Sequence, residues 1–144
     1  MAQHEYFLAS PGELAALDLA KPPSGQLAEG RAAALPGVDP SVVLLSLVEV
    51  LTIVQYEALA ARVHHEPVPG GPVLAIDPAV VDAIRGADGD PEMEWDDAVG
   101  QWAAIVADEL GHDPDHLLEI TDGLRQLAGS TDPAHRLYCW TADE

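Results

Sequence analysis

Five Asp-Pro pairs constrain the fold of this chain more than any other feature. Five of its twelve prolines directly follow an aspartate. An aspartate before a helix accepts hydrogen bonds from the unpaired N–H groups of the first turn, and proline fits the next position because it has no N–H to leave unpaired. Each pair therefore predicts a helix start. The pairs are Asp39-Pro40, Asp77-Pro78, Asp90-Pro91, Asp113-Pro114 and Asp132-Pro133.

A further helix start is predicted near the N-terminus, where Ser10 and Glu13 have the spacing of a capping box around Pro11. Apolar periodicity and turn residues give the remaining boundaries. The predicted helices span residues 11–20, 40–62, 78–85, 95–111 and 114–128, the second being one helix or two with a joint near Thr52. The predicted strands span residues 5–9, 73–76 and 136–141, whereas residues 21–30 and 65–72 are predicted loops or turns.

The last two predicted helices each carry an apolar face. The first face consists of Trp95, Val99, Trp102, Ile105 and Val106. The second consists of Leu117, Ile120, Leu124 and Leu127. Steps of three and four residues place these side chains on one side of a helix, so we expect both faces in the core.

Strand-forming residues lie at both termini, in Tyr6-Phe7-Leu8 and Leu137-Tyr138-Cys139-Trp140. Alternation places Leu137 and Cys139 on one face of the final strand and Tyr138 and Trp140 on the other. A lone strand cannot satisfy its backbone groups, so we expect the two segments in one sheet. With 144 residues, 48% of them hydrophobic, residues 1–144 are predicted to form a single, predominantly helical α+β domain whose small sheet includes the N- and C-terminal strands.

The chain is strongly acidic, with 25 Asp and Glu against 6 Lys and Arg. Residues 73–144 hold seventeen of the acids and three of the bases, and six carboxylates fall within residues 88–97. This balance excludes non-specific binding of nucleic acid through its phosphates, which needs clustered Lys and Arg. It also disfavours an anionic membrane surface. It favours either a basic protein partner or a surface whose charge serves solubility.

A cytoplasmic location is expected. The N-terminal residues lack the basic and apolar regions of a signal peptide, and Cys139 is the sole cysteine, so no internal disulfide forms. The most apolar stretch, residues 42–61, contains Glu49, Gln55 and Glu57 and has no flanking basic cluster. It does not resemble a membrane span.

The sequence contains two partial metal-binding motifs, and each lacks a feature that its motif requires. The acidic run aligns with a calcium-binding loop only in part, because Met93 stands where that loop needs Gly and Val99 where it needs Glu. Glu109, His112 and His116 could ligate a transition metal, but Gly111 and Pro114 break the helix on which a zincin motif depends. We therefore predict no bound metal.

No catalytic residues emerge from the sequence. It contains no nucleophilic Ser motif, no phosphate-binding Gly-rich loop and no paired Cys motif, so no cofactor is predicted either. His135 lies four residues before Cys139, a spacing that in a strand separates them by more than about 10 Å, too far for His135 to activate the thiol. Cys139 is interpreted as a buried structural thiol.

Five segments follow one another in a recognisable order: Tyr6-Phe7-Leu8, Ser10-Pro11-Gly12-Glu13-Leu14, residues 42–51, residues 78–84 and Leu137-Tyr138-Cys139-Trp140. This order resembles that of the YfbM-like family of small uncharacterised bacterial proteins. It is also similar to short hypothetical actinobacterial proteins that begin with Tyr-Phe and end near Leu-Tyr-Cys-Trp. The resemblance implies an α+β fold and supplies no catalytic residues.

The acidic run is the candidate binding site. We expect a non-enzymatic interaction module that binds a basic partner, for example an immunity or antagonist protein acting on a basic toxin, with Trp95 as an aromatic anchor among carboxylates. The alternatives are a small metal-assisted hydrolase using Glu109, His112 and His116, or a housekeeping subunit whose charge serves solubility. The oligomeric state stays open. The predicted partner surface comprises Asp88, Asp90, Glu92, Glu94, Trp95, Asp96 and Asp97.

Overall fold

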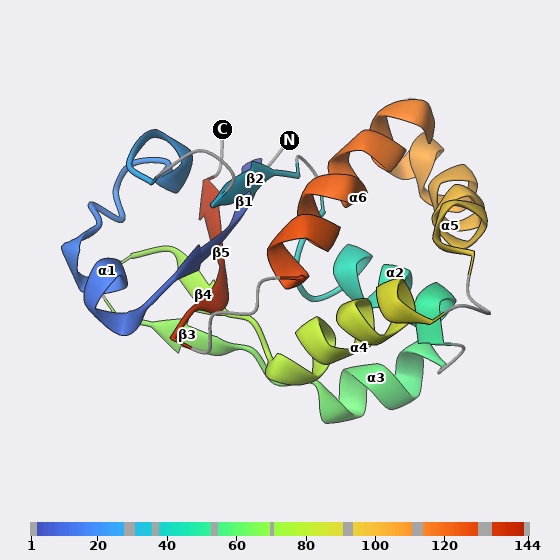
Figure 1. Ribbon diagram of the computed structural model, residues 1–144, viewed down its shortest axis with the longest axis horizontal. Coiled ribbons are helices and arrows are strands. Elements are labelled where there is room, and N and C mark those ends of the chain that lie inside the picture. The colour runs from blue at the N-terminus through green and yellow to red at the C-terminus, as the bar shows by residue number, and fades with distance from the viewer. Residues whose placement is uncertain are drawn as a thin grey trace.

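An antiparallel five-stranded sheet lies at the centre of the protein (Figure 1). The computed structural model describes residues 3–27, 31–35, 38–52, 55–69, 71–90, 94–110, 114–129 and 134–142. The first and last strands pair along their whole lengths, from Gln3 opposite Ala142 to Ala9 opposite Arg136, which confirms the predicted pairing of the terminal segments. The order across the sheet is β2 (Ala32–Ala34), β1 (Gln3–Ala9), β5 (Arg136–Ala142), β4 (Val73–Ala75) and β3 (Glu66–Val68).

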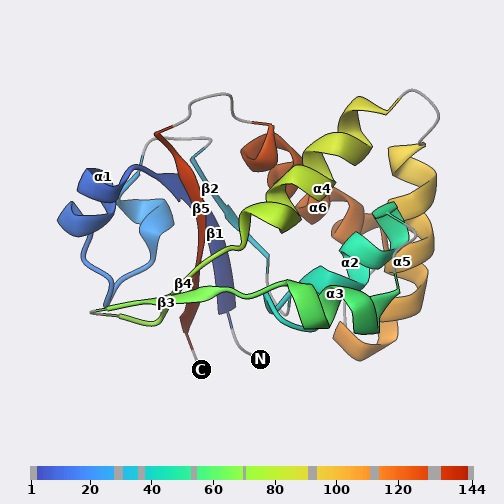
Figure 2. The ribbon, with the colours of Figure 1, turned by 90° about the horizontal axis from the view of Figure 1, so that it is seen from below.

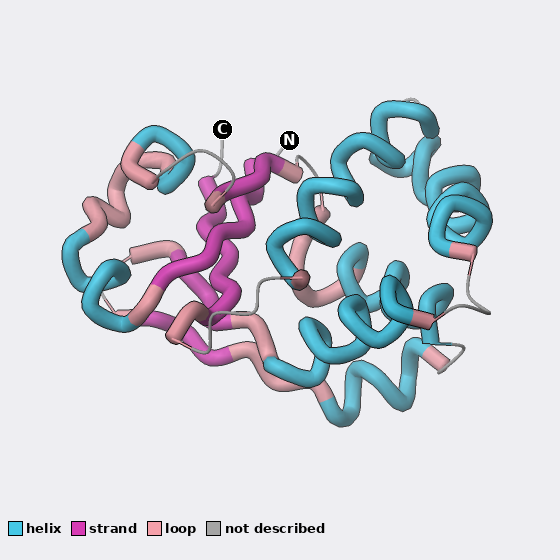
Figure 3. Tube along the Cα trace, viewed as in Figure 1, coloured by secondary structure: helices cyan, strands magenta, loops and turns pink. Residues whose placement is uncertain are grey.

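Helices cover both faces of this sheet. The short α1 and the 3₁₀ turn η1 lie on one face, whereas α2 to α6 form a layer on the other (Figures 2 and 3). Helices packed against an antiparallel sheet make the fold α+β, as predicted. The helical elements are α1 (Pro11–Ala16), η1 (Pro23–Gly25), α2 (Val43–Thr52), α3 (Tyr56–Arg62), α4 (Pro78–Gly89), α5 (Trp95–Leu110) and α6 (Pro114–Ala128).

The alternation of β1 and β5 divides the buried side chains between two clusters. Tyr6 and Cys139 face α2–α6 and belong to the larger cluster. Phe7 and Tyr138 face α1 and η1, where their rings stack with centroids 5.5 Å apart. Trp140 Nε1 donates to Leu19 O at 2.8 Å, which ties the segment after α1 to the sheet. Both central strands are thus buried on both faces.

Aspartates and serine cap several helices as the sequence predicts. Ser10 and Glu13 form the capping box of α1. Asp77 Oδ1 accepts from Ala79 N at the start of α4. Asp39 carboxylate oxygens accept from the N–H groups of residues 41–43 before α2. Asp90, however, caps the C-terminus of α4, so its predicted role as a helix start is wrong.

Other boundaries also differ from the prediction. The sequence does not predict β2, because alanine is a weak strand former. Strand β3 lies within a predicted turn region and contains Pro67; proline in a sheet is confined to positions such as this edge strand. Helix α1 is shorter than predicted and α4 is longer. The predicted joint near Thr52 is confirmed, since α2 ends there. No helix in the described part of the chain is long and apolar enough to cross a membrane.

Candidate functional site

The predicted acidic run lies where α4 ends and α5 begins. Asp88 is in the last turn of α4, and Asp90 is the residue that caps it. Asp96 and Asp97 are exposed in the first turn of α5, where carboxylates interact favourably with the helix dipole. Glu92 lies outside the described residues.

Trp95 does not project from this run. Only 6% of its surface is exposed, and it belongs to the main hydrophobic cluster together with Val99 and Trp102 of the same helix. Arg125 of α6 covers the ring, with its Cζ 5.1 Å from the ring centroid. The hypothesis that Trp95 offers a ring face to a basic partner is therefore corrected: the protein's own arginine contacts that ring, and the side chain belongs to the core.

Asp88 is likewise engaged within the protein. Arg125 Nε donates to Asp88 Oδ1, and Arg125 Nη1 lies 3.8 Å from Asp122 Oδ1. The guanidinium thus joins α6 to α4 while it covers Trp95. The Arg125 guanidinium partly neutralises the Asp88 carboxylate. The remaining net negative charge of residues 88–97 therefore lies mainly near the start of α5.

Two carboxylates at that end repel one another. The side chain of Asp97 lies so close to Glu94 that it raises the pKa of Glu94 above its usual value, through a shared hydrogen bond and through charge repulsion. Both residues are exposed. A cation brought to this position would relieve the repulsion, so the pair is a favourable contact point for a Lys or Arg of another molecule.

The exposed face of α5 combines these carboxylates with an apolar side chain that sequence reasoning placed in the core. Ile105 is 70% exposed, whereas the rest of its predicted face, Trp95, Val99, Trp102 and Val106, is buried. We call the exposed residues of this face the α5 stripe. It comprises Glu94, Asp97, Gln101, Ala104, Ile105 and Asp108, which fall within about 100° of helix circumference at 3.6 residues per turn.

The neighbouring helix adds further negative charge. Asp115, Glu119 and Asp122 of α6 are exposed and recur at intervals of four and three residues. Over residues 94–129 the sequence holds nine acids and one base, Arg125, a net charge of −8. The acidic surface is thus wider than the predicted run, and the periodic spacing of the α6 carboxylates was the signal that could have revealed it.

No protein-family model, no curated protein and no solved structure matches this chain. The resemblance to the YfbM-like family stays a prediction.

The other candidate chemistry gains no support. In the described part of the chain, no group of three or more His, Cys, Asp or Glu side chains could hold a metal ion. Glu109 lies near the end of α5 and His116 in α6, whereas His112 is outside the described residues. Because the metal-assisted hydrolase depends on that set, it stays an untested alternative.

Cys139 has the properties of a structural thiol. It is 1% exposed, and burial raises its pKa to about 12. His135 Nε2 instead lies 3.4 Å from Glu13 Oε1. A thiol that stays protonated at neutral pH is a poor nucleophile, so this residue supports no covalent chemistry.

Proposed function

We propose that this protein is a non-enzymatic interaction module whose α5 stripe binds a basic protein. The observation that carries the proposal is the exposure of Ile105 beside carboxylates on the same helix face. Single exposed apolar residues are common on protein surfaces. Here, however, the residue lies on a helix whose surroundings carry a net negative charge, and an apolar contact rimmed by charges is the usual composition of a protein-binding patch.

The charges and the isoleucine would act at different stages of binding. The negative field of α5 and α6 attracts a basic partner over about 8–10 Å at physiological ionic strength and raises the association rate. Burial of Ile105 contributes after contact. Covering the exposed part of one isoleucine is worth about 1–2 kcal/mol, which slows dissociation roughly 10-fold.

An immunity or antagonist protein directed at a basic toxin is the concrete form of this function. Such a partner carries clustered Lys and Arg that can approach the Glu94 and Asp97 carboxylates, whose shared hydrogen bond and mutual repulsion raise the pKa of Glu94. Like-charge repulsion of this kind destabilises the unbound protein, and a cationic side chain of a bound partner would relieve it. The proposal assigns no catalytic residue.

Affinity capture from the cells that produce the protein tests the proposal, with four baits compared in parallel. They are the wild type, Ile105→Asp, the double variant Asp97→Asn and Asp108→Asn, and the control Val42→Asp. Val42 is a second large apolar residue at the surface, 56% exposed and outside α5, so its variant adds the same charge elsewhere. We expect a basic protein to be retained by the wild type and by Val42→Asp and to be lost with Ile105→Asp.

The captured protein is then titrated at low and high salt against each variant. The Asp-to-Asn double variant is expected to slow association at low salt and to flatten the salt dependence, because screening already removes the steering at high salt. Circular dichroism checks that each variant is folded. If no captured protein distinguishes Ile105→Asp from Val42→Asp, the α5 stripe is not a binding surface.

A further inference from the structure

The two edges of the sheet are not equally protected. Strands β2 and β3 form these edges, and β2 is the upper one in Figure 1. The outer side of an edge strand presents backbone N–H and C=O groups that have no neighbouring strand. Another chain can pair with those groups unless the edge is blocked. Which residues face outward follows from the hydrogen bonds on the inner side of each strand.

Strand β3 is blocked by a proline. Ile76 N, just after β4, donates to Leu137 O next to the paired part of β5. Backbone groups alternate in direction along a strand, so Ala75 faces the opposite way, toward its partner Glu66 in β3. By the same alternation the backbone of Pro67 faces outward. Because proline has no N–H, this edge offers no donor at its central residue.

Strand β2 has no such block. Leu8 N of β1 donates to Arg31 O at 2.9 Å, just before β2 begins. By alternation the backbone of Ala33 also faces β1, whereas the N–H and C=O groups of Ala32 and Ala34 face outward. No described residue forms a hydrogen bond with these outward groups. The edge of β2 therefore keeps both donors and acceptors available to another chain.

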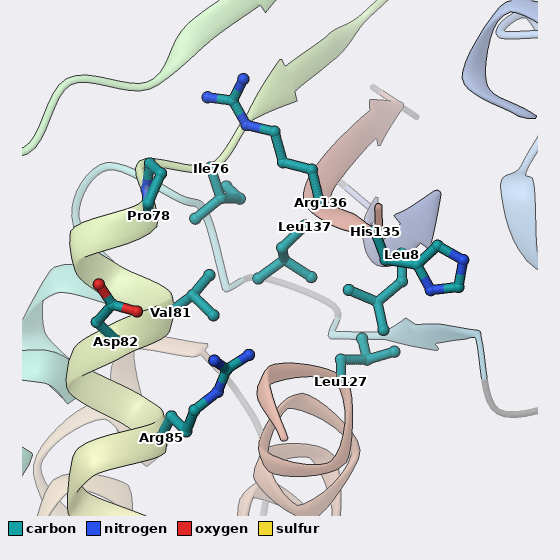
Figure 4. A pocket seen from close by; sticks show the side chains of 10 residues that line it. All are labelled: Leu8, Ile76, Pro78, Val81, Asp82, Arg85, Leu127, His135, Arg136 and Leu137. Carbon is teal, nitrogen blue, oxygen red and sulfur yellow. The ribbon is translucent and has the colours of Figure 1, made fainter. Parts of the chain in front are cut away.

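The two faces of β2 pack against other elements. Helix α6 crosses one face so closely that a Cβ added at Gly123 would lie 3.0 Å from Ala33 Cβ. Further along α6, Leu127 lies beside Leu8 of β1 (Figure 4). The 3₁₀ turn η1 also packs against β2. Ala34 is nevertheless exposed, so the outer edge is the side from which a sixth strand can be added, about 4.8 Å from β2.

The charge of the protein indicates which kind of chain would add to this edge. A second copy would bring together two chains that each carry a net charge of −19, and repulsion between them opposes association. An extended segment rich in Lys and Arg is instead attracted. The side chains of β2 are methyl groups, which leave room beside them for larger side chains on the added strand.

We propose that β2 binds an extended, basic segment of another protein as an additional strand of the sheet. Main-chain hydrogen bonds to Ala32 and Ala34 hold the segment, as in other cases of strand addition. The negative charge of the protein selects Lys and Arg over Asp and Glu in that segment. The site is separate from the α5 stripe, and the proposal does not rest on the function proposed for that stripe.

Amide chemical-shift and hydrogen-exchange measurements on the full chain test the proposal with three synthetic peptides. The basic peptide is acetyl-Lys-Thr-Val-Thr-Val-Thr-Lys-amide. The acidic peptide has Glu in place of both Lys, and the methylated peptide is the basic one with an N-methyl group on every Thr and Val. Main-chain hydrogen bonds carry strand addition, so a peptide of simple composition suffices.

The basic peptide is expected to give saturable shifts in β2 at millimolar concentration. It should also slow the exchange of the Ala32 and Ala34 amide protons, which exchange rapidly in the free protein. The acidic peptide should bind about tenfold or more weakly because of charge repulsion. The methylated peptide should not bind, because it lacks the N–H donors of the central residues. These comparisons use the wild type alone.

A proline variant then assigns the edge. Ala34→Pro removes an outward N–H, as Pro67 does in β3, and leaves the inward hydrogen bonds of β2 intact. It should weaken the basic peptide about fivefold or more, the effect of losing one hydrogen bond. Ala34→Thr is the matched control, because it changes the same exposed position and keeps the N–H. Circular dichroism checks that both variants are folded.

Four results would overturn the proposal. The first is the absence of saturable shifts in β2 with the basic peptide. The second is the acidic peptide binding as tightly as the basic one, which would remove the role of charge. The third is undiminished binding of the methylated peptide, which would remove the role of the main chain. The fourth is a wild-type dimer, seen by light scattering and lost in Ala34→Pro, which would assign the edge to a second copy.

Discussion

Replacing Trp95 by Ala is expected to destabilise the protein strongly, because the side chain belongs to the core and is only 6% exposed. Truncating a buried tryptophan to alanine costs about 3–5 kcal/mol. Loss of the ring beneath Arg125 removes a cation–π contact worth about 0.5–1 kcal/mol. We expect a total near 4 kcal/mol, a large share of the roughly 5–15 kcal/mol that stabilises a typical domain.

Urea unfolding followed by far-ultraviolet circular dichroism measures this loss. For a small domain the unfolding free energy falls by about 1–3 kcal/mol per molar urea, so the midpoint should drop by about 2 M. Trp95→Phe retains an aromatic ring against the core and should lose less than half as much. Any effect of Trp95→Ala on partner binding would then follow from the loss of folding.

Ile105→Ala is the control on the same helix. Its side chain is 70% exposed, and such surface changes usually stay within about 0.5 kcal/mol. If Trp95→Ala cost no more than this control, the ring would not be part of the core, the reasoning would be refuted, and Trp95 would again be a candidate anchor for a partner.

Two further predictions concern close packing and the buried thiol. Gly71→Ala should lower the unfolding free energy by about 1–3 kcal/mol, because a Cβ at this position would lie 2.4 Å from Leu19 Cβ. Adding Leu19→Ala should not restore stability, since alanine keeps that Cβ atom. An unchanged urea midpoint for Gly71→Ala would contradict this prediction. Cys139, with its pKa of about 12, should resist a thiol reagent at neutral pH until the protein unfolds, so rapid labelling of the native protein would refute its burial. Between pH 9.0, the ordinary pKa of a cysteine thiol, and pH 12, only the thiol of the unfolded chain releases its proton. The unfolding free energy should therefore fall over this range by up to about 1.4 kcal/mol per pH unit. The fall should be less steep in Cys139→Ala, which lacks the thiol.

An Asp-Pro pair in the sequence predicts that a helix boundary is near, but it does not indicate whether that boundary is the N-terminus or the C-terminus of a helix. Asp77-Pro78 and Asp90-Pro91 are the same dipeptide, yet Asp77 caps the start of α4 and Asp90 its end. The reason is that proline disfavours helical geometry in the preceding residue, which suits a helix end as well as a start. The terminal strands were predictable because their alternating large side chains need two buried faces. Strand β2 has three alanines and depends on β1, a partner that local sequence does not indicate.

The candidate site shows the same limit. The concentration of carboxylates is visible in the sequence, but their partners are not, since Arg125 reaches Asp88 from a helix 37 positions away. Ile105 follows Trp102 by three residues and reads as part of one apolar face, although it lies at the edge of the buried arc of α5 and is 70% exposed. Sequence spacing gives the direction of a side chain but does not indicate whether another element packs against it.

The pairing of β1 with β5 has a consequence for how the chain is assembled. Strand β5 is the last described strand in the sequence, yet it lies between β1 and β4 in the sheet. During synthesis both of those strands emerge before their common neighbour, and their open edges can pair with other chains until it arrives. The long loop that β1 and β5 close also predicts slow sheet formation compared with the packing of the intervening helices. Translation that stalls before residue 136 would therefore leave an aggregation-prone intermediate, in which the helices can pack but the sheet still lacks its central strand.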